Sequence, residues 1–124
     1  MRVRISKIGS SRGSGTDHRP RQIPIPIPEG ELVCYVRWIF KDGRFAAQTR
    51  PPEGNSGRAR ATDAVRAGRP LCVVHDDESC TWTSPATSVE HDSRGLPREV
   101  ITQSGSIYRV TFLERVTLQG IGAA

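Results

Sequence analysis

Four side chains in this 124-residue chain have the chemistry of a zinc site: Cys72, His75, Cys80 and His91. Structural zinc sites usually take their ligands in closely spaced pairs, such as CxxC, which present two ligands from one turn. Only Cys72 and His75 have such a spacing here, and they fall in a predicted strand, where positions three apart point to opposite faces. We therefore expect no metal site.

The same residues offer a thiol nucleophile, because Cys80 could approach His75 or His91 across neighbouring strands. The acidic run Asp76–Glu78 just before it would raise the pKa of a nearby thiol rather than lower it. That run is typical of a solvated turn, although its carboxylates could also hold a divalent ion. The sequence has no glycine-rich phosphate loop of the usual kinds. We expect neither a catalytic residue nor a bound cofactor.

Phosphate binding is the chemistry that the composition favours. Arginine supplies 16 of the 18 basic residues, and its planar guanidinium suits two-pronged contacts to phosphate oxygens. Hydroxyl groups at strand ends would add hydrogen bonds, and aromatic rings could stack on a base. The candidate ligand-binding residues are Arg44, Trp82, Thr83, Ser84, Thr102, Ser104, Tyr108 and Arg109. The alternative is that the tryptophan packs in a core and the arginines only solvate a surface.

Four of these candidates lie on a predicted hairpin from Val100 to Phe112. Ser104-Gly105 suits a two-residue primed turn, because glycine adopts positive φ values at little cost. With that loop, Thr102 faces Ile107, Ile101 faces Tyr108 and Val100 faces Arg109. One face then carries Ile101, Tyr108, Val110 and Phe112, and the other carries Val100, Thr102, Ile107, Arg109 and Thr111. The second face is mixed in character and suited to a polar ligand.

A second predicted hairpin joins Leu32–Phe40 to Arg44–Thr49 through the turn Lys41-Asp42-Gly43. Leu32–Phe40 is rich in β-branched and aromatic residues, which favour strands, and both of its faces are largely apolar. A domain this small rarely covers both faces of a strand by itself, which indicates association between subunits. The following segment, Arg50–Arg60, is too rich in glycine, proline and charge for regular structure. It could be a surface excursion or a phosphate-binding loop.

The remaining elements are short. Thr62-Asp63 offers an N-cap for a helical turn at Ala64–Ala67, with Gly68 and Pro70 ending it. Further strands are expected at Leu71–His75, Cys80–Thr83 and Ala86–Glu90, with an edge strand at Val116–Leu118. About six short strands and one small helix predict a mainly β fold (α+β with one short helix), built as a bent antiparallel sheet or a partly open small barrel.

Residues 1–31 are predicted to form a flexible, basic and proline-rich arm, and residues 32–124 a single β-rich domain. Pro24, Pro26 and Pro28 remove every second amide donor, which argues against a central strand. The longest apolar run, Leu32–Phe40, falls far short of the roughly 20 residues that span a bilayer. No apolar stretch of a secretory signal follows the basic start. An odd number of cysteines favours a reducing compartment, so we expect a cytoplasmic protein without a membrane partner.

Two segments near the C-terminus resemble a known family. Trp82–Glu90 (WTSPATSVE) and Thr102–Val110 (TQSGSIYRV) are similar to the TSP-x-x-x-[VI]-E strand and T-x-[NS]-x-x-Y hairpin of small phage-encoded proteins, among them the Thoeris anti-defence sponge proteins. The resemblance implies an oligomer that sequesters a cyclic ADP-ribose-type immune signal intact in the host cytoplasm. Some members also hold cyclic oligonucleotides. It also implies that Thr102, Ser104 and Arg109 line the signal pocket, with Trp82 and Thr83 nearby.

The sequence therefore predicts a non-catalytic homo-oligomer that binds a small, phosphate-bearing nucleotide signal. One alternative is a basic β-barrel that binds nucleic acid, because the net charge is +5 and residues 1–31 are rich in cations. Another is an inhibitor or scaffold that presents the Leu32–Phe40 strand to a host protein by strand addition.

Overall fold

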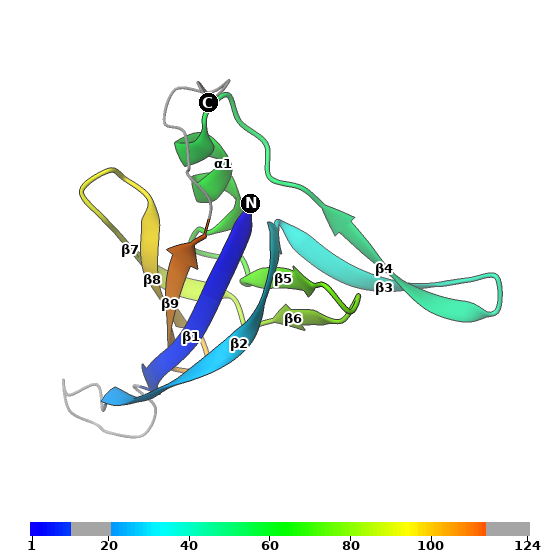
Figure 1. Cartoon of the computed structure of the whole chain (residues 1–124), viewed down its shortest axis with the longest axis horizontal. Coiled ribbons are helices and arrows are strands. Elements are labelled where there is room, and N and C mark those ends of the chain that lie inside the picture. Colours follow the sequence, from blue (N-terminus) through cyan, green and yellow to red (C-terminus); the bar gives the residue numbers. More distant parts are fainter. Residues whose placement is uncertain (11–20, 114–124) are drawn as a thin grey trace.

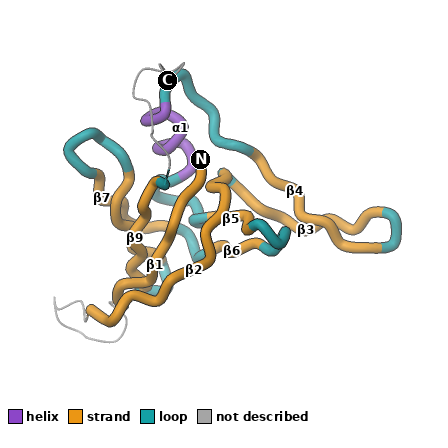
Figure 2. Tube along the Cα trace, in the orientation of Figure 1, coloured by secondary structure: helices purple, strands orange, loops and turns teal. Residues whose placement is uncertain are grey.

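The computed structural model describes residues 1–10 and 21–113, which form nine strands and one helix (Figures 1 and 2). The strands are β1 (Arg2–Ser10), β2 (Arg21–Val33), β3 (Tyr35–Lys41), β4 (Arg44–Arg50), β5 (Cys72–His75), β6 (Cys80–Trp82), β7 (Ala86–His91), β8 (Pro97–Thr102) and β9 (Ser106–Phe112), and the helix is α1 (Gly57–Ala64). Seven strands form one curled antiparallel sheet in the order β6-β5-β2-β1-β9-β8-β7, and β3 and β4 form a separate pair. The prediction of a mainly β fold with a bent antiparallel sheet and one short helix is confirmed.

The hydrophobic core joins this sheet to α1. Val3, Leu32 and Val100 come from three distant parts of the sequence and are at most 1% exposed. Ala64 and Val65, at the end of α1, belong to the same buried cluster. Burial alternates along the start of β1, as expected for a strand with one face on a core.

The N-terminal segment is not an arm in its described parts. β1 lies in the middle of the sheet, between β2 and β9, so the prediction of a flexible arm is wrong for residues 2–10 and 21–31. Residues 11–20 lie outside the described residues. Within the described residues, β5 pairs with β2 only from Gly30 to Val33, and the stretch Ile25–Ile27 between the outer prolines pairs with β1 alone. Prolines at alternate positions remove donors from one side of a strand, and a strand with one unpaired side tolerates that loss.

The predicted strand Leu32–Phe40 is divided at Cys34. Leu32 and Val33 end β2 and pair with β5, whereas the chain from Tyr35 onward pairs with β4. The β3–β4 hairpin consequently leaves the sheet and projects to one side of the molecule (Figure 1). The predicted hairpin is present, but Lys41 pairs with Arg44, so its turn has two residues, Asp42 and Gly43, with φ values of 54° and 78°. Positive φ at both positions is the signature of a primed turn.

Asp63 fastens the base of this hairpin to α1. Its Oδ2 accepts hydrogen bonds from the Glu53 amide at 3.0 Å and from the Cys34 thiol at 3.2 Å. Arg50 and Arg69 form ion pairs with the same carboxylate at 3.6 and 3.3 Å. The hydrogen bonds from Glu53 and Cys34 are the main reason that the pKa of Asp63 is lowered. Burial, together with the neighbouring carboxylate, raises the pKa of the Cys34 thiol to about 11, so this cysteine is a neutral structural donor.

The β8–β9 hairpin has a register one residue away from the predicted one. Ile101 faces Ile107, Val100 faces Tyr108 and Glu99 faces Arg109. The loop therefore has three residues, Gln103 to Gly105, rather than two. The Gly105 amide donates to the Thr102 carbonyl at 2.9 Å, and Gly105 takes a φ of 88°. Glycine in this left-handed conformation closes a three-residue loop as readily as a two-residue one.

The helix begins earlier than predicted. Ser56 is its N-cap, and the Ser56 hydroxyl accepts a hydrogen bond from the Ala59 amide at 3.0 Å. Thr62, predicted to be part of the cap, is inside α1, and its hydroxyl donates to the Arg58 carbonyl at 3.0 Å. The end of the supposedly irregular Arg50–Arg60 segment is thus helical. The predicted edge strand Val116–Leu118 lies outside the described residues.

Candidate functional site

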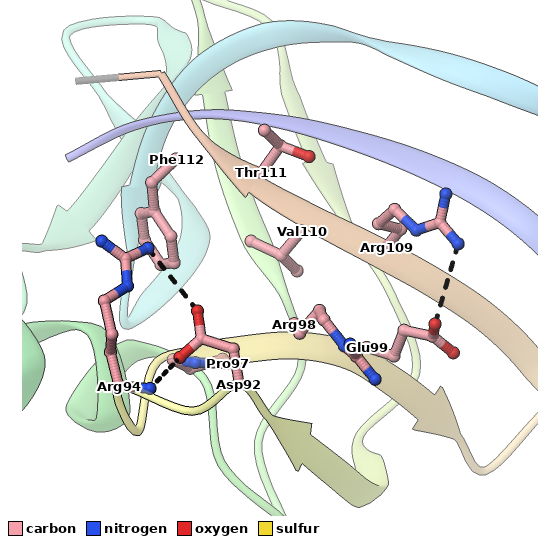
Figure 3. Close-up of a pocket in the computed structure, with 9 residues that line it drawn as sticks. All are labelled: Asp92, Arg94, Pro97, Arg98, Glu99, Arg109, Val110, Thr111 and Phe112. Atoms are coloured by element: carbon pink, nitrogen blue, oxygen red, sulfur yellow. Dashed lines mark hydrogen bonds and ion pairs between the residues drawn. The ribbon is translucent and has the colours of Figure 1, made fainter. Parts of the chain in front are cut away.

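A hollow of about 400 Å³ opens beside Arg109, where β8 and β9 meet the β7–β8 turn (Figure 3). It is lined by Asp92, Arg94, Pro97, Arg98, Glu99, Arg109, Val110, Thr111 and Phe112. We refer to this site as the arginine hollow. Its position next to Arg109 follows from the register, because Glu99 and Arg109 face each other across β8 and β9.

Three guanidinium groups border the arginine hollow, and each has an acidic neighbour. Arg94 approaches Asp92 at 3.6 Å and Arg109 approaches Glu99 at 3.8 Å (Figure 3). Arg98 pairs with Glu90 on the adjacent strand β7. The arginine side chains are 50–59% exposed. Asp92 and Glu99 are only 26% and 12% exposed, so it is the guanidinium groups rather than the carboxylates that are open to an incoming anion.

Asp92 shapes the turn that carries Arg94. Its Oδ1 accepts hydrogen bonds from the backbone amides of Arg94 at 2.8 Å and Leu96 at 3.1 Å. These backbone donors, the Leu96 amide above all, lower the pKa of Asp92. The Asp92 carboxylate is therefore committed to holding the turn, and Arg94 projects from a fixed backbone.

The inner wall of the arginine hollow is apolar. Pro97 and Val110 are buried, and Phe112 is half-buried and packs against the core cluster. Thr111 is exposed and adds a hydroxyl to the rim. The site therefore combines cations at its opening with an aliphatic and aromatic wall.

The predicted hydroxyl residues gather elsewhere, in a group that we call the hydroxyl cluster: Ser84, Thr102 and Ser104. The Ser84 hydroxyl donates to the Ser104 hydroxyl at 3.0 Å and accepts from the Ser104 amide at 3.1 Å. The Thr102 and Ser104 hydroxyls are 3.1 Å apart, and Thr102 is only 2% exposed. The neighbouring Thr83 hydroxyl accepts from the Leu71 amide at 3.0 Å and donates to the Ser84 carbonyl at 2.8 Å. These hydroxyls close turns within the chain.

The other three predicted residues are also apart from the arginine hollow. Trp82 ends β6, at the opposite edge of the sheet from β7, and is 48% exposed. Tyr108 pairs with Lys7 and Val100 and packs half-buried on the core. Arg44 lies at the start of β4 in the projecting hairpin. Of the eight predicted site residues, the structure therefore brings only Arg109 to this hollow.

Of the residues weighed for a zinc site or a thiol nucleophile, His75, Cys72 and Cys80 have structural surroundings, and His91 is exposed at the end of β7. His75 is 7% exposed; its Nε2 lies 2.6 Å from the Thr81 hydroxyl and its Nδ1 lies 3.3 Å from the Glu29 carbonyl. Burial raises the pKa of the Cys72 thiol, and burial followed by the charge of Asp77 raises that of Cys80. Within residues 1–10 and 21–113, no group of three or more histidine, cysteine, aspartate or glutamate side chains is placed to hold a metal ion.

Sequence reasoning missed Arg94, Arg98 and Glu99. They lie in the segment HDSRGLPRE, whose glycine and proline indicate a turn. The segment was therefore interpreted only as a turn, and its charged residues were not considered as part of a site. The available signal is the charge on both sides of Pro97, with Arg94 before it and Arg98 and Glu99 after it, and with Arg109 opposite Glu99 in the neighbouring strand. Only the correct β8–β9 register reveals that these charges converge.

No known family, curated protein or solved structure matches this chain. The resemblance at Trp82–Glu90 and Thr102–Val110 stays a prediction. In the described part of the chain, the helix content is limited to the eight residues of α1, and no helix is long and apolar enough to cross a bilayer.

Proposed function

We propose that the chain binds a small phosphate-bearing molecule of the nucleotide type in the arginine hollow and sequesters it without altering its covalent bonds. The observation that carries this proposal is the convergence of Arg94, Arg98 and Arg109 on one open hollow with an apolar wall. Guanidinium groups form strong, directional hydrogen bonds with phosphate oxygens. An apolar wall suits the uncharged ring of the same ligand.

The electrostatics support an anion rather than a cation. The lining contains three arginines against Asp92 and Glu99, and Asp92 is already engaged by two backbone amides. At 3.6 and 3.8 Å, the Arg94 and Arg109 contacts to their carboxylates are longer than hydrogen bonds. A phosphate placed between them would gain charge-assisted hydrogen bonds that the carboxylates do not make.

The size and shape of the arginine hollow suit a small molecule. A volume of about 400 Å³ lies within the range of about 300–1,000 Å³ that is usual for ligand sites. Phe112, which is half-buried, offers a ring on which a base could lie, since stacking on a ring accepts any base. The residues that line the hollow include no thiol and no imidazole, which favours retention over a reaction.

The resemblance to the Thoeris anti-defence sponge proteins narrows the ligand class. On that basis the ligand is a cyclic ADP-ribose-type signal or a cyclic oligonucleotide, and the protein is a phage product that acts in the host cytoplasm to evade defence. Self-association is part of this proposal.

Isothermal titration calorimetry of the full chain with cyclic ADP-ribose isomers and cyclic dinucleotides tests the proposal. Arg94→Gln and Arg109→Gln should each weaken binding by about tenfold to a hundredfold, because a hydrogen bond to a charged group contributes about 1.5–3 kcal/mol. Arg66→Gln is the matched control, since Arg66 is exposed and does not line the hollow. Heating the complex should release the ligand intact.

Three outcomes would contradict the proposal. One is no heat with any phosphate-bearing probe, and another is equal loss of affinity in Arg66→Gln. The third is release of a cleaved product, which would indicate an enzyme. Salt separates the nucleic-acid alternative: affinity for DNA or RNA falls steeply with salt as counterions are released, whereas binding of one small ligand depends on salt far less.

A further inference from the structure

The projecting β3–β4 hairpin carries exposed rings on one of its faces. Cross-strand pairing places Val36 opposite Thr49, Trp38 opposite Ala47 and Phe40 opposite Phe45. Since residues that face each other across a ladder share a face, these six side chains form one surface, which we call the aromatic face. Trp38 is 47% exposed, Phe40 66% and Phe45 69%. Clustered apolar exposure of this kind usually marks a binding surface.

The rings of the aromatic face offer two places where a flat group can lie. Phe40 and Phe45 contact each other edge to face, with centroids 5.2 Å apart and planes at 65°. In this arrangement the edge of one ring supports the face of the other, so the pair serves as one platform. Trp38, on the adjacent rung, is the second platform.

The same hairpin concentrates positive charge. Between Tyr35 and Arg50, four residues are basic and one, Asp42, is acidic, which gives a net charge of +3; the basic residues are Arg37, Lys41, Arg44 and Arg50. Within the described residues, no ion pair involves Arg37, Lys41 or Arg44, and all three are exposed. Lys41 and Arg44 form the rung next to Phe40 and Phe45. The exposed rings therefore adjoin cations that have no carboxylate partner.

We propose that the aromatic face binds single-stranded nucleic acid, with bases stacked on its two platforms and phosphates held by Lys41 and Arg44. Proteins that bind single strands combine aromatic rings, on which bases stack, with cations that follow the backbone. Arg44 borders the same hollow of about 440 Å³ as Trp38 and Phe45, so this cation and these rings adjoin one space. Glu78 borders that hollow from the β5–β6 turn and would repel phosphates, which favours a backbone path along the hairpin tip.

The spacing of the platforms favours a single strand over a duplex. Trp38 and Phe40 are two residues apart on β3, which separates them by about 7 Å along the strand. That distance is about twice the step of about 3.4 Å between stacked bases in a duplex strand. Neighbouring bases must therefore unstack to lie on both platforms. A single strand can splay its bases in this way, whereas a duplex would have to open.

The end of the hairpin argues against a membrane as the partner. The residues at the tip, Lys41, Asp42 and Arg44, are charged and lie beyond the rings. Insertion of the tip into a bilayer would bury these charges before it buried any ring, which is costly. A nucleotide instead presents an apolar base and an anionic phosphate together, in the combination that the rings and cations of the hairpin complement.

Fluorescence anisotropy of labelled oligothymidine and oligouridine, titrated with the full chain, tests the proposal. At low salt either oligomer should bind about tenfold or more tightly than a duplex of the same length. Trp38→Leu should weaken binding by about fivefold to a hundredfold, because leucine keeps an apolar side chain but removes a stacking ring. Trp82→Leu is the matched control, since Trp82 is 48% exposed but lies on β6, outside the hairpin.

Two further readouts report on the rings and the cations separately. With Trp82→Phe, Trp38 is the only tryptophan in the chain, and its emission should be quenched as a base stacks on it. With Trp38→Phe, the emission of Trp82 should not change. Arg44→Gln should reduce the slope of log affinity against log salt by about 0.7, the value for one phosphate contact on a single strand. Arg66→Gln, at an exposed site outside the hairpin, should leave that slope unchanged.

Several outcomes would overturn the proposal. They are an absence of binding to either oligomer, equal affinity for single strand and duplex, equal effects of the two leucine substitutions, and binding to anionic vesicles alone. An effect of Arg109→Gln as large as that of Arg44→Gln would place the oligomer in the arginine hollow instead. None of the hairpin residues lines that hollow, so Trp38→Leu should leave calorimetric titrations with cyclic ADP-ribose isomers unchanged. Failure here is therefore distinct from failure of the proposed function.

Discussion

The two tight hairpins, β3–β4 and β8–β9, have similar strands and both turn at a glycine, yet only one of them has its apolar face covered. In β8–β9, Val100 and Val110 are at most 5% exposed, because the hairpin is part of the curled sheet and these residues pack in the core cluster with Ala64. In β3–β4, Phe40 and Phe45 are about two-thirds exposed, because the chain leaves the sheet at Cys34. The alternation of apolar and polar side chains is a local property of the sequence. Whether the apolar face is covered depends on which distant segments of the chain join the same sheet and core.

The largest expected difference between the hairpins is in the cost of truncating an apolar side chain. Val100→Ala removes two buried methyl groups and should lower the free energy of unfolding by about 2 kcal/mol. Phe45→Ala should change it by less than about 0.5 kcal/mol at concentrations where the chain is monomeric, as for most exposed sites. Urea denaturation followed by circular dichroism measures both. Equal losses would mean that the projecting hairpin is part of the monomer core.

The junction between the hairpin and the body should respond to acid. The folded pKa of Asp63 lies below its ordinary value, so its stabilising contribution is present above about pH 4 and is lost as the pH falls through the folded value. Asp63→Asn should cost about 1–2 kcal/mol at pH 7 and make stability less sensitive to acidification. Hydrogen exchange should also become faster in β3 and β4.

Asp42→Asn is the control for that experiment. Asp42 lies in the exposed turn of the same hairpin with a positive φ, which asparagine tolerates. It should leave both the stability at pH 7 and the acid response nearly unchanged. If hydrogen exchange in β3 and β4 is equally slow in wild type and Asp63→Asn, the Asp63 contacts do not hold the base of the hairpin.

Substitutions of the glycines in the two turns should separate a loss of global stability from a local loosening of one hairpin. Gly43 and Gly105 have φ values of 78° and 88°, and forcing a residue with a Cβ into that region costs about 1–2 kcal/mol. Gly105→Ala should lower global stability by about 1 kcal/mol, because β8 and β9 are part of the sheet. Gly43→Ala should loosen only the hairpin tip, with little change in global unfolding. Urea midpoints together with hydrogen exchange distinguish the two outcomes, and equal global losses would contradict them.

These turns also show how far the sequence could predict the structure. The turn predicted at Lys41-Asp42-Gly43 was right in place and one residue too long, and its two loop residues, Asp42 and Gly43, both tolerate positive φ. Gly105 fits the end of a two-residue or a three-residue loop equally well, and the choice shifts every cross-strand pair by one. That single shift brought Glu99, rather than Val100, opposite Arg109.

The prediction for the N-terminal segment was wrong for a different reason. The prediction for Pro24–Pro28 considered only the loss of backbone amide donors. That loss matters only on the side of the strand where a neighbouring strand would accept hydrogen bonds from those amides. Which side of β2 stays unpaired depends on β5, about 40 residues away in the sequence. The mainly β class could be predicted because β-branched and aromatic runs are local signals. The arginine hollow could not, because its residues converge only through long-range pairing.

The smallest expected effect decides between the two candidate sites. Ser84 joins the β8–β9 turn through two hydrogen bonds to Ser104, so Ser84→Ala should lower the free energy of unfolding by about 0.5–1 kcal/mol and leave ligand affinity unchanged. Arg109→Gln should weaken ligand binding and change stability less, because the half-exposed Arg109 guanidinium lies 3.8 Å from Glu99, farther than a hydrogen bond. Calorimetry and urea denaturation on the same two variants measure both quantities. If Ser84→Ala weakens binding as strongly as Arg109→Gln, the hydroxyl cluster belongs to the ligand site and the arginine hollow alone does not account for binding.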